Sequence, residues 1–279
     1  MTVAVVTLVH GRAAHLRMQH ASLARGVVPD HYVVAAMGDH TVRAWHPAVP
    51  PTPDVVEIPV QAGLLPLAAA RNAAALRALE RGADVLVFLD VDCLAGPALV
   101  QAYADAARDR PDVLWSGPVT YLPPAGPDGY PLDGLDALDD PHASRPAPAP
   151  GERRLGGDPD LFWSLSFAVH ADGWRRAGGF CESYVGYGAE DTDFAATATS
   201  AGLTLGWLGG ARAYHQHHPT SSPPVEHLAD ILHNGALFRR RWGRWPMEGW
   251  LREFERMGLV EREDGEWRLT PSGRQTARA

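Results

Sequence analysis

The chain has 279 residues, 46% of them apolar, and carries a formal net charge of −8. This length and composition are typical of one large globular domain, alone or with a small appendage, and exclude a disordered chain. The negative balance argues against a general nucleic-acid-binding protein, which needs a positive field to meet phosphates. All 25 basic residues are Arg, which excludes Schiff-base chemistry on a lysine.

The sequence also bears on compartment. No apolar run approaches the roughly 20 residues that cross a bilayer, so we expect no transmembrane segment. In a secretion signal the apolar stretch follows a positively charged region, and the N-terminus of this sequence has no such region. We therefore expect a cytoplasmic protein. Two cysteines, Cys93 and Cys181, cannot build a disulfide framework.

The first half of the chain alternates strand-like and helix-like segments. Predicted strands cover residues 2–9, 32–37, 55–58, 85–89 and 113–116. Predicted helices cover residues 15–25, 67–81 and 97–108. Alternation of this kind predicts an α/β fold, with a mostly parallel sheet flanked by helices.

The second half is less regular. Residues 122–159 are rich in Pro, Gly and Asp without apolar periodicity, which is typical of a lid, a binding loop or a disordered insert. Further strands are predicted at 161–169, 203–208 and 212–214, and further helices at 172–177, 190–201, 225–242 and 247–257. Residues 259–269 read as a hairpin. We expect a main domain over 1–224, with halves at 1–120 and 160–224, and a helical and hairpin extension over 225–279.

Two carboxylates follow the predicted strand 85–89, in the sequence Asp90-Val91-Asp92. Alternation along an extended chain sends both to one side, and ligands of open α/β sheets bind at the carboxyl ends of strands. Two acids there would hold a divalent cation, which would neutralise charge on phosphate oxygens. The alternative is that they are loop acids that cap the next helix.

A second acidic cluster opens the predicted helix 190–201. Glu190, Asp191 and Asp193 follow a glycine-rich, aromatic segment, Tyr184 to Ala189. Acids in the first turn of a helix complement its dipole, which would explain them without any function. A carboxylate held there beside a flexible loop is equally well placed to act as a general base.

Three histidines lie close together after the predicted strand 212–214, in Tyr214-His215-Gln216-His217-His218. On an extended chain His215 and His217 point the same way, and neutral imidazoles are common metal ligands. Together with Asp92 they would form a mixed oxygen and nitrogen set that favours Mn²⁺ over Ca²⁺. A solvated polar loop is the alternative. His10, His20 and His170 lack such neighbours and are expected to be structural.

These clusters, in this order, resemble glycosyltransferases of the GT-A fold. The resemblance is to family 2 enzymes and to the C-terminal segment of the β-1,4-galactosyltransferase and polypeptide N-acetylgalactosaminyltransferase families, and covers about residues 2 to 220. It rests on four motifs: Asp90-Val91-Asp92, Gly178-Gly179-Phe180, Gly186-Tyr187-Gly188-Ala189-Glu190-Asp191 and His215-Gln216-His217. Tyr187 and Ala189 stand where the galactosyltransferases have Trp and Gly, which leaves the donor sugar open.

The resemblance implies a Rossmann-like GT-A fold and a role for individual residues. Donor-binding roles fall to Thr7 and Arg12 in the nucleotide pocket, Asp39 at the uracil, Arg71 and Asn72 near base and phosphates, Asp90 near the ribose or a metal-bound water, and Glu190 at the donor sugar. Asp92, with His215 or His217, would bind Mn²⁺ or Mg²⁺. Asp191 would be the catalytic base. Trp163 and Tyr187 are weaker candidates for stacking on the acceptor.

The implied function is a metal-dependent glycosyltransferase, most simply an inverting one, that moves a sugar from a nucleotide-diphosphate donor, with UDP favoured, to a hydroxyl acceptor. A metal-dependent nucleotidyltransferase and a non-catalytic nucleotide-sugar-binding protein are the alternatives. The basic, aromatic segment 239–245 could touch a membrane surface, an acidic acceptor or donor phosphates, but it also reads as a helix end that packs on the main domain. The hairpin resembles the wing of a DNA reader, yet its many acids argue against DNA binding.

Overall fold

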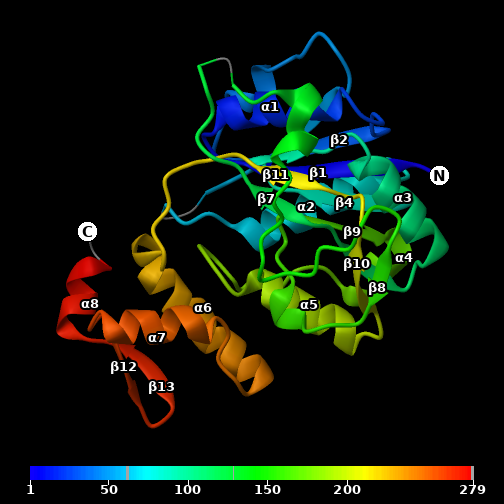
Figure 1. Cartoon of the computed structure of the whole chain (residues 1–279). Coiled ribbons are helices and arrows are strands. Elements are labelled where there is room, and N and C mark those ends of the chain that lie inside the picture. The colour runs from blue at the N-terminus through cyan, green and yellow to red at the C-terminus, as the bar shows by residue number, and fades with distance from the viewer. Residues whose placement is uncertain (61–62, 128, 278–279) are drawn as a thin grey trace.

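The computed structural model of the chain describes residues 1–60, 63–127 and 129–277 (Figure 1). Position 128 of the irregular segment and the last two residues of the extension therefore lie outside the described part. The helices and strands of the main domain build a layered α/β fold, and a smaller group of helices with a hairpin follows it. In the part of the chain that is described, no helix has both the length and the apolar character of a membrane span.

The core of the main domain is an eight-stranded sheet in the order β3-β2-β1-β4-β9-β6-β10-β8. Its strands are β1 (Val3–Val9), β2 (His31–Met37), β3 (Pro53–Ile58), β4 (Val85–Leu89), β6 (Val113–Ser116), β8 (Arg153–Leu155), β9 (Ser166–His170) and β10 (Thr204–Leu208). The neighbours from β3 to β4 pair in parallel, as do β6 and β10. β9 is antiparallel to both β4 and β6, and β8 is antiparallel to β10. The prediction of a large, mostly parallel sheet is confirmed.

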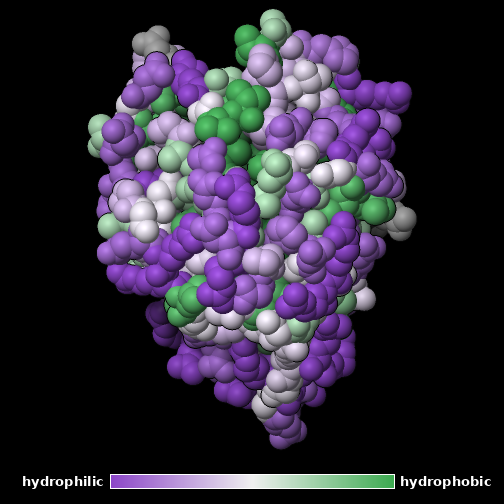
Figure 2. Space-filling model, turned by 90° about the vertical axis from the view of Figure 1, so that its right-hand side faces the viewer, coloured by the Kyte–Doolittle hydropathy of each residue, from purple (hydrophilic) through white to green (hydrophobic). Residues whose placement is uncertain are grey.

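Helices cover both faces of this sheet (Figure 1). One face packs on α1 (Ala13–Leu23) and α3 (Leu99–Asp109), and the other packs on α2 (Leu67–Glu80), α4 (Ala171–Ala177) and α5 (Glu190–Ser200). The strands β1, β2 and β4 are buried almost throughout because both of their faces are covered, which explains their continuous apolar runs. On the outer face shown in Figure 2, hydrophilic residues predominate and apolar ones form small separate areas.

A small second sheet lies beside the end of β4 and was not fully predicted. Its order is β5-β11-β7, with β5 (Cys93–Ala95), β11 (Ala213–His215) and β7 (Val119–Tyr121). β11 runs antiparallel to β5, and its partners are Ala213 with Ala95 and His215 with Cys93. This pairing joins the segment that follows Asp92 to the histidine-rich segment, more than a hundred residues later.

The segment 122–159 contains more structure than its composition suggested. It holds the 3-10 helix η2 (Leu132–Leu138) and the edge strand β8, and its last residue begins the 3-10 helix η3 (Pro159–Leu161). Another 3-10 helix, η1 (Val42–Ala44), lies in the first half of the chain. The predicted strand 161–169 begins only at Ser166. Its first residue, Leu161, is instead the last residue of η3, which is capped by the Asp158 side chain accepting a hydrogen bond from the Asp160 backbone N–H.

The C-terminal extension consists of η4 (Val225–His227), α6 (Leu228–Trp242), α7 (Glu248–Arg256), the hairpin β12 (Val260–Glu263) with β13 (Glu266–Leu269), and α8 (Pro271–Thr276). The two longer helices and the hairpin share an apolar cluster that includes Ile231, Trp245, Leu251 and Trp267. The two helices and the hairpin occur where the sequence placed them, and α8 is an addition. The extension leaves the small sheet after β11 and returns to pack near α5 (Figure 1).

Candidate functional site

The carboxyl end of β4 is held by a glutamine that sequence reasoning missed. Gln19 on α1 is fully buried, and its amide nitrogen donates to the backbone carbonyl of Asp90 at 2.7 Å and to that of Cys93 at 3.2 Å. Its side-chain oxygen lies 2.8 Å from the Thr7 hydroxyl and accepts from the Tyr32 hydroxyl at 2.8 Å. One buried side chain therefore fixes the turn that carries both aspartates. A polar residue on the apolar face of the predicted helix was the available signal.

Asp92 lies next to two imidazoles. The Nε2 atom of His215 is 3.5 Å from one Asp92 carboxylate oxygen, and the Nε2 atom of His218 is 3.4 Å from the other. The pairing of β11 with β5 brings them together, since the Gln216 backbone N–H also donates to the Asp92 carbonyl at 2.6 Å. One ligand atom from each of the three residues lies within 4.8 Å of the others. The chemistry of this set suits a divalent cation such as Mn²⁺.

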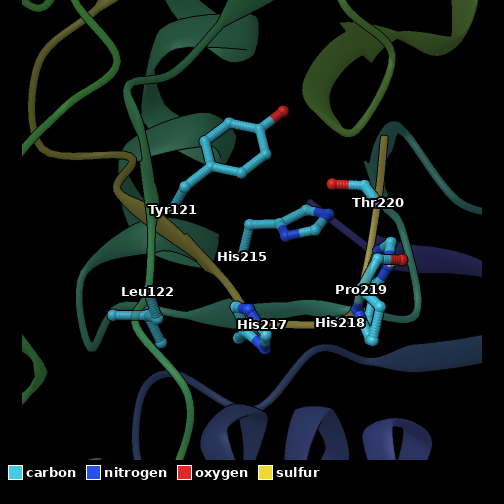
Figure 3. Close-up of a pocket in the computed structure, with 7 residues that line it drawn as sticks. All are labelled: Tyr121, Leu122, His215, His217, His218, Pro219 and Thr220. Carbon is cyan, nitrogen blue, oxygen red and sulfur yellow. Dashed lines mark hydrogen bonds between the residues drawn. The ribbon is translucent and has the colours of Figure 1, made fainter. Parts of the chain in front are cut away.

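The histidine partner differs from the sequence expectation. His217 was predicted to point the same way as His215, on the premise of an extended chain, but β11 ends at His215 and the residues after it form no regular structure. His217 is exposed, and its backbone N–H donates to the Tyr130 hydroxyl at 2.9 Å. His218 takes the place beside Asp92 that was assigned to His217. In Figure 3 the His217 ring lies apart from the ring of His215.

The surroundings of Asp92 favour its ionised form. Burial alone would raise the pKa of Asp92, but the hydrogen bond with His218 and the charges of His215 and Arg12 outweigh it and lower the pKa to about 2. Arg12 donates to the same carboxylate directly. The resemblance implied that Arg12 lines the nucleotide pocket. In the structure its guanidinium lies against the carboxylate of Asp92. Asp92 is therefore a carboxylate at neutral pH, as a metal ligand must be.

Behind Asp92, one arginine links the two acidic motifs. Arg71 on α2 is 3% exposed and donates to Asp90 at 3.2 Å and to Glu190 at 3.1 Å. Burial, together with the nearby charge of Asp92, raises the pKa of Asp90 to about 6 despite its contact with Arg71. Two carboxylates from distant parts of the chain are thus held together by one buried cation. Removing this cation would leave both acids without their partner, which is strongly destabilising.

Asp191 differs from the other acids because it has no basic partner among the described residues. Its carboxylate accepts from the Thr192 backbone N–H at 2.7 Å and from the Thr192 hydroxyl at 3.3 Å. Burial and the adjacent Glu190 raise the pKa of Asp191 to about 7. A carboxyl group that titrates near neutral pH is suited to accept a proton during catalysis.

Three further predicted residues fill structural places. Thr7 is fully buried and its hydroxyl donates to the Leu89 carbonyl at 2.7 Å, so it supports the strand end and does not line a pocket. Asn72 holds the Gly-Gly-Phe turn, since it accepts from the Phe180 N–H at 2.8 Å and donates to the Phe180 carbonyl at 2.9 Å. Asp39 follows β2 and accepts from the Thr41 hydroxyl at 2.6 Å. The uracil contact of Asp39 stays a prediction.

A cavity of about 380 Å³ opens beside the two histidines. It is lined by Tyr121, Leu122, His215, His217, His218, Pro219 and Thr220. The Tyr121 ring stacks on His215 with 4.6 Å between ring centroids, as Figure 3 shows, and is 48% exposed. Of the two predicted acceptor residues, Tyr187 is exposed on the glycine-rich loop, and Trp163 is partly buried with the Arg145 guanidinium 5.0 Å from its ring centroid. Neither Tyr121 nor Arg145 was singled out from the sequence.

Comparison with known proteins supports the fold and reaches no further. No family model matches the chain, and no curated protein is detectably similar to it in sequence. Among solved structures it is similar to GalNAc-T7, crystallised with UDP, GalNAc and Mn²⁺, with a TM-score of 0.57 and 14% identity over 81% of this chain. It spans 46% of that protein, less than half its length. It is also similar to S. aureus TarS 1-349, with a TM-score of 0.56 and 13% identity over 97% of this chain and 96% of TarS.

Both of these proteins are glycosyltransferases of the GT-A fold, and the prediction of that fold for the present chain is confirmed. At such low identity the likeness carries the architecture and no assignment of individual residues. The resemblance to family 2 and the galactosyltransferase-type motif therefore stay predictions.

Proposed function

We propose that this protein is a metal-dependent glycosyltransferase that uses a nucleotide-diphosphate sugar, with UDP as the favoured nucleotide. The observation that carries the proposal is that, in a GT-A fold, the buried Asp92 lies beside the partly buried His215 and His218, and that the same chain holds a carboxyl cluster that includes Asp191. The presence of UDP, GalNAc and Mn²⁺ in the GalNAc-T7 crystal supports the choice of donor and metal. The acceptor supplies a hydroxyl group.

Asp92, His215 and His218 would hold the cation, which supplies Lewis-acid stabilisation of the leaving diphosphate when it is bound. Asp191 takes the proton from the acceptor hydroxyl at one of its carboxylate oxygens. The acceptor oxygen then forms a bond to the anomeric carbon, and the bond between that carbon and the β-phosphate oxygen breaks. The nucleoside diphosphate leaves with the electron pair. A single base without a second nucleophile fits inversion at the anomeric carbon.

The remaining groups hold this arrangement in place. Arg71 keeps Asp90 and Glu190 within one buried ion cluster, and Glu190 is placed next to Asp191, where it would contact the donor sugar. Positioning and electrostatic stabilisation of this kind supply most of the rate acceleration in group transfer. Tyr121, stacked on His215, forms the exposed wall of the cavity beside the cation ligands.

The proposal is tested by a thermal-shift panel of UDP, GDP, TDP and their sugar derivatives, each with and without Mn²⁺. We expect UDP compounds to raise the melting temperature only when Mn²⁺ is present, because ligands that bind the native state stabilise it. The same shift should disappear in Asp92→Ala. Absence of a shift with every nucleotide in the wild-type protein would contradict the proposal.

A further inference from the structure

The glycine-rich loop that leads to Asp191 has a backbone that needs outside support. Gly186 and Gly188 have φ angles of +75° and +95°, and Ala189, which precedes α5, has a φ of +70°. Side chains disfavour this left-handed region, so Ala189 in particular adds strain. Such a loop keeps one conformation only where its surroundings impose it.

The support comes from α6 of the C-terminal extension. Asn234 is fully buried, and its amide nitrogen donates to the carbonyls of Val185 at 3.1 Å and Tyr187 at 3.2 Å. Asp230, one turn earlier on α6, accepts from the Tyr187 backbone N–H at 3.1 Å. Two side chains of one helix therefore bind both the donor and the acceptor groups of the loop backbone.

The fit between α6 and the loop is close. A Cβ atom added at Gly186 would come within 2.4 Å of an Asp230 carboxylate oxygen, so this glycine is required for the approach. Beyond the loop, Asp193 is 1% exposed and accepts from Arg241 and Trp242 at the end of α6, each at 2.7 Å. The extension therefore forms hydrogen bonds with the chain on both sides of Glu190 and Asp191.

Aromatic side chains of the extension also hold Tyr187. Its ring stacks on His227 with 4.4 Å between centroids and lies 6.1 Å from the ring of Trp250, nearly parallel to both. The residue nevertheless stays 37% exposed. Burial, together with the negative charges of Asp191 and Glu190, raises the pKa of the Tyr187 hydroxyl.

We propose that Asn234 and Asp230 are positioning residues of the transfer reaction. Through them the C-terminal extension contributes to the active site, because it holds Asp191 and Tyr187 in the orientation that faces the acceptor. This inference rests on the proposed function for its catalytic meaning, although the clamp on the loop can be tested without any activity. Neither residue needs to touch a substrate, because each acts through the loop backbone.

The structural arm of the test is hydrogen exchange of residues 183–192 in the full chain. In Asp230→Ala the Tyr187 amide loses its acceptor, and we expect its exchange to accelerate about tenfold or more, while Asp230→Asn, which keeps an acceptor oxygen, should stay near the wild-type rate. Asn234→Ala should accelerate exchange across the loop. The matched control is His233→Ala, an exposed neighbour on α6, which should change nothing.

The functional arm uses hydrolysis of UDP-glucose, UDP-galactose and UDP-N-acetylgalactosamine with Mn²⁺. For the donor that the wild type hydrolyses fastest, we expect Asn234→Ala and Asp230→Ala to lower kcat about tenfold or more with KM within a factor of about two, since misplacing a catalytic group costs rate. Unchanged exchange and kcat in both variants would overturn the inference, as would equal losses in His233→Ala. A wild type that hydrolyses none of the three would count against the proposed function alone.

Discussion

Two aspartates of the candidate site differ in opposite directions in their pKa values, and the difference matches the roles proposed for them, Asp92 as a metal ligand and Asp191 as a base. Asp92 faces His215, His218 and Arg12, and these lower its pKa to about 2 although it is buried. Burial and the charge of Glu190 raise the pKa of Asp191 to about 7, although the charge of Arg71 lowers it, and none of the described basic side chains forms an ion pair with Asp191. Burial favours the neutral acid at both positions, and the neighbouring charges decide the outcome. The fold thus provides one carboxylate that stays ionised and one that can exchange a proton.

The strongest test of this contrast is Asp191→Asn. The amide cannot accept the acceptor proton, and we expect transfer to fall by about 10²- to 10⁴-fold, the range that general-base catalysis contributes. Steady-state kinetics with the donor found in the nucleotide panel measures this. Binding of UDP with Mn²⁺ should be retained, since Asp191 holds no cation in this account. A variant with wild-type turnover would favour a nucleotidyltransferase, which has no use for this residue.

The next largest effect is expected at the other aspartate. Asp92→Asn removes the anionic ligand, and the affinity for Mn²⁺ should fall about 100-fold or more, beyond the 10- to 100-fold typical of residues that merely support ligands. Isothermal titration with Mn²⁺ in the presence of UDP measures it. Asp191→Asn is the matched control and should bind Mn²⁺ as the wild type does. Equal losses in both variants would mean that the two aspartates do not have separate roles.

The pH dependence sharpens the contrast further. Below the raised pKa of Asp191, near 7, the base is protonated and inactive, so kcat/KM should rise about tenfold per pH unit up to that value and level off above it. Asp92, the proposed metal ligand, has a pKa lowered to about 2 and should not contribute to the profile between pH 5 and 9. The measurement is kcat/KM across this range at saturating Mn²⁺. A profile without any inflection between pH 6 and 8 would contradict the assignment of Asp191.

The raised pKa of Asp191 should also affect how the free energy of unfolding depends on pH. A carboxyl group whose folded pKa is raised stabilises the protein below its ordinary pKa of 3.8, and this stability is lost as the pH rises toward about 7. In Asp191→Asn the side chain cannot ionise, so the variant does not lose this stability as the pH rises. We therefore expect the variant to be more stable than the wild type at pH 8 by about 2 kcal/mol, allowing for partial exposure, with the gain vanishing at pH 4. Urea unfolding at both pH values decides it, and a variant less stable at pH 8 would refute the reasoning.

The smallest expected effect distinguishes two neighbouring histidines. His218→Ala should weaken Mn²⁺ binding about tenfold, whereas His217→Ala should leave it within a factor of about two. Of these two histidines, only His218 lies beside Asp92, whereas His217 is exposed. The paired titration therefore compares the structure with the expectation drawn from an extended chain.

Elements with strong local signals were predictable. The strands β1, β2 and β4 and the helices α2 and α5 follow from apolar runs, helix formers and glycine stops, which act within a few residues. The order of the motifs predicted the GT-A fold, which is confirmed. The role that it implied for Asp191 stays a prediction. The choice between His217 and His218 was not predictable, because it depends on where β11 stops, and that is set by pairing with β5.

Burial and long-range contacts account for the other differences. The resemblance implied nucleotide-binding roles for Thr7 and Asn72, which stay predictions. Their hydrogen bonds with Leu89 and Phe180, which lie far away in sequence, were not predictable. The role of Asn234 was not predicted, because nothing within α6 indicates that its amide binds a loop more than forty residues earlier. A single sequence carries no record of such pairings, which arise only when the chain is packed.

The most direct test of the central claim is anomalous diffraction at the manganese edge from crystals soaked with Mn²⁺ and UDP. The account predicts one peak within about 2.0 to 2.4 Å of an Asp92 carboxylate oxygen and of the imidazole nitrogens of His215 and His218, at normal ligand distances. A peak held by other residues, or a UDP bound with no metal near Asp92, would contradict it.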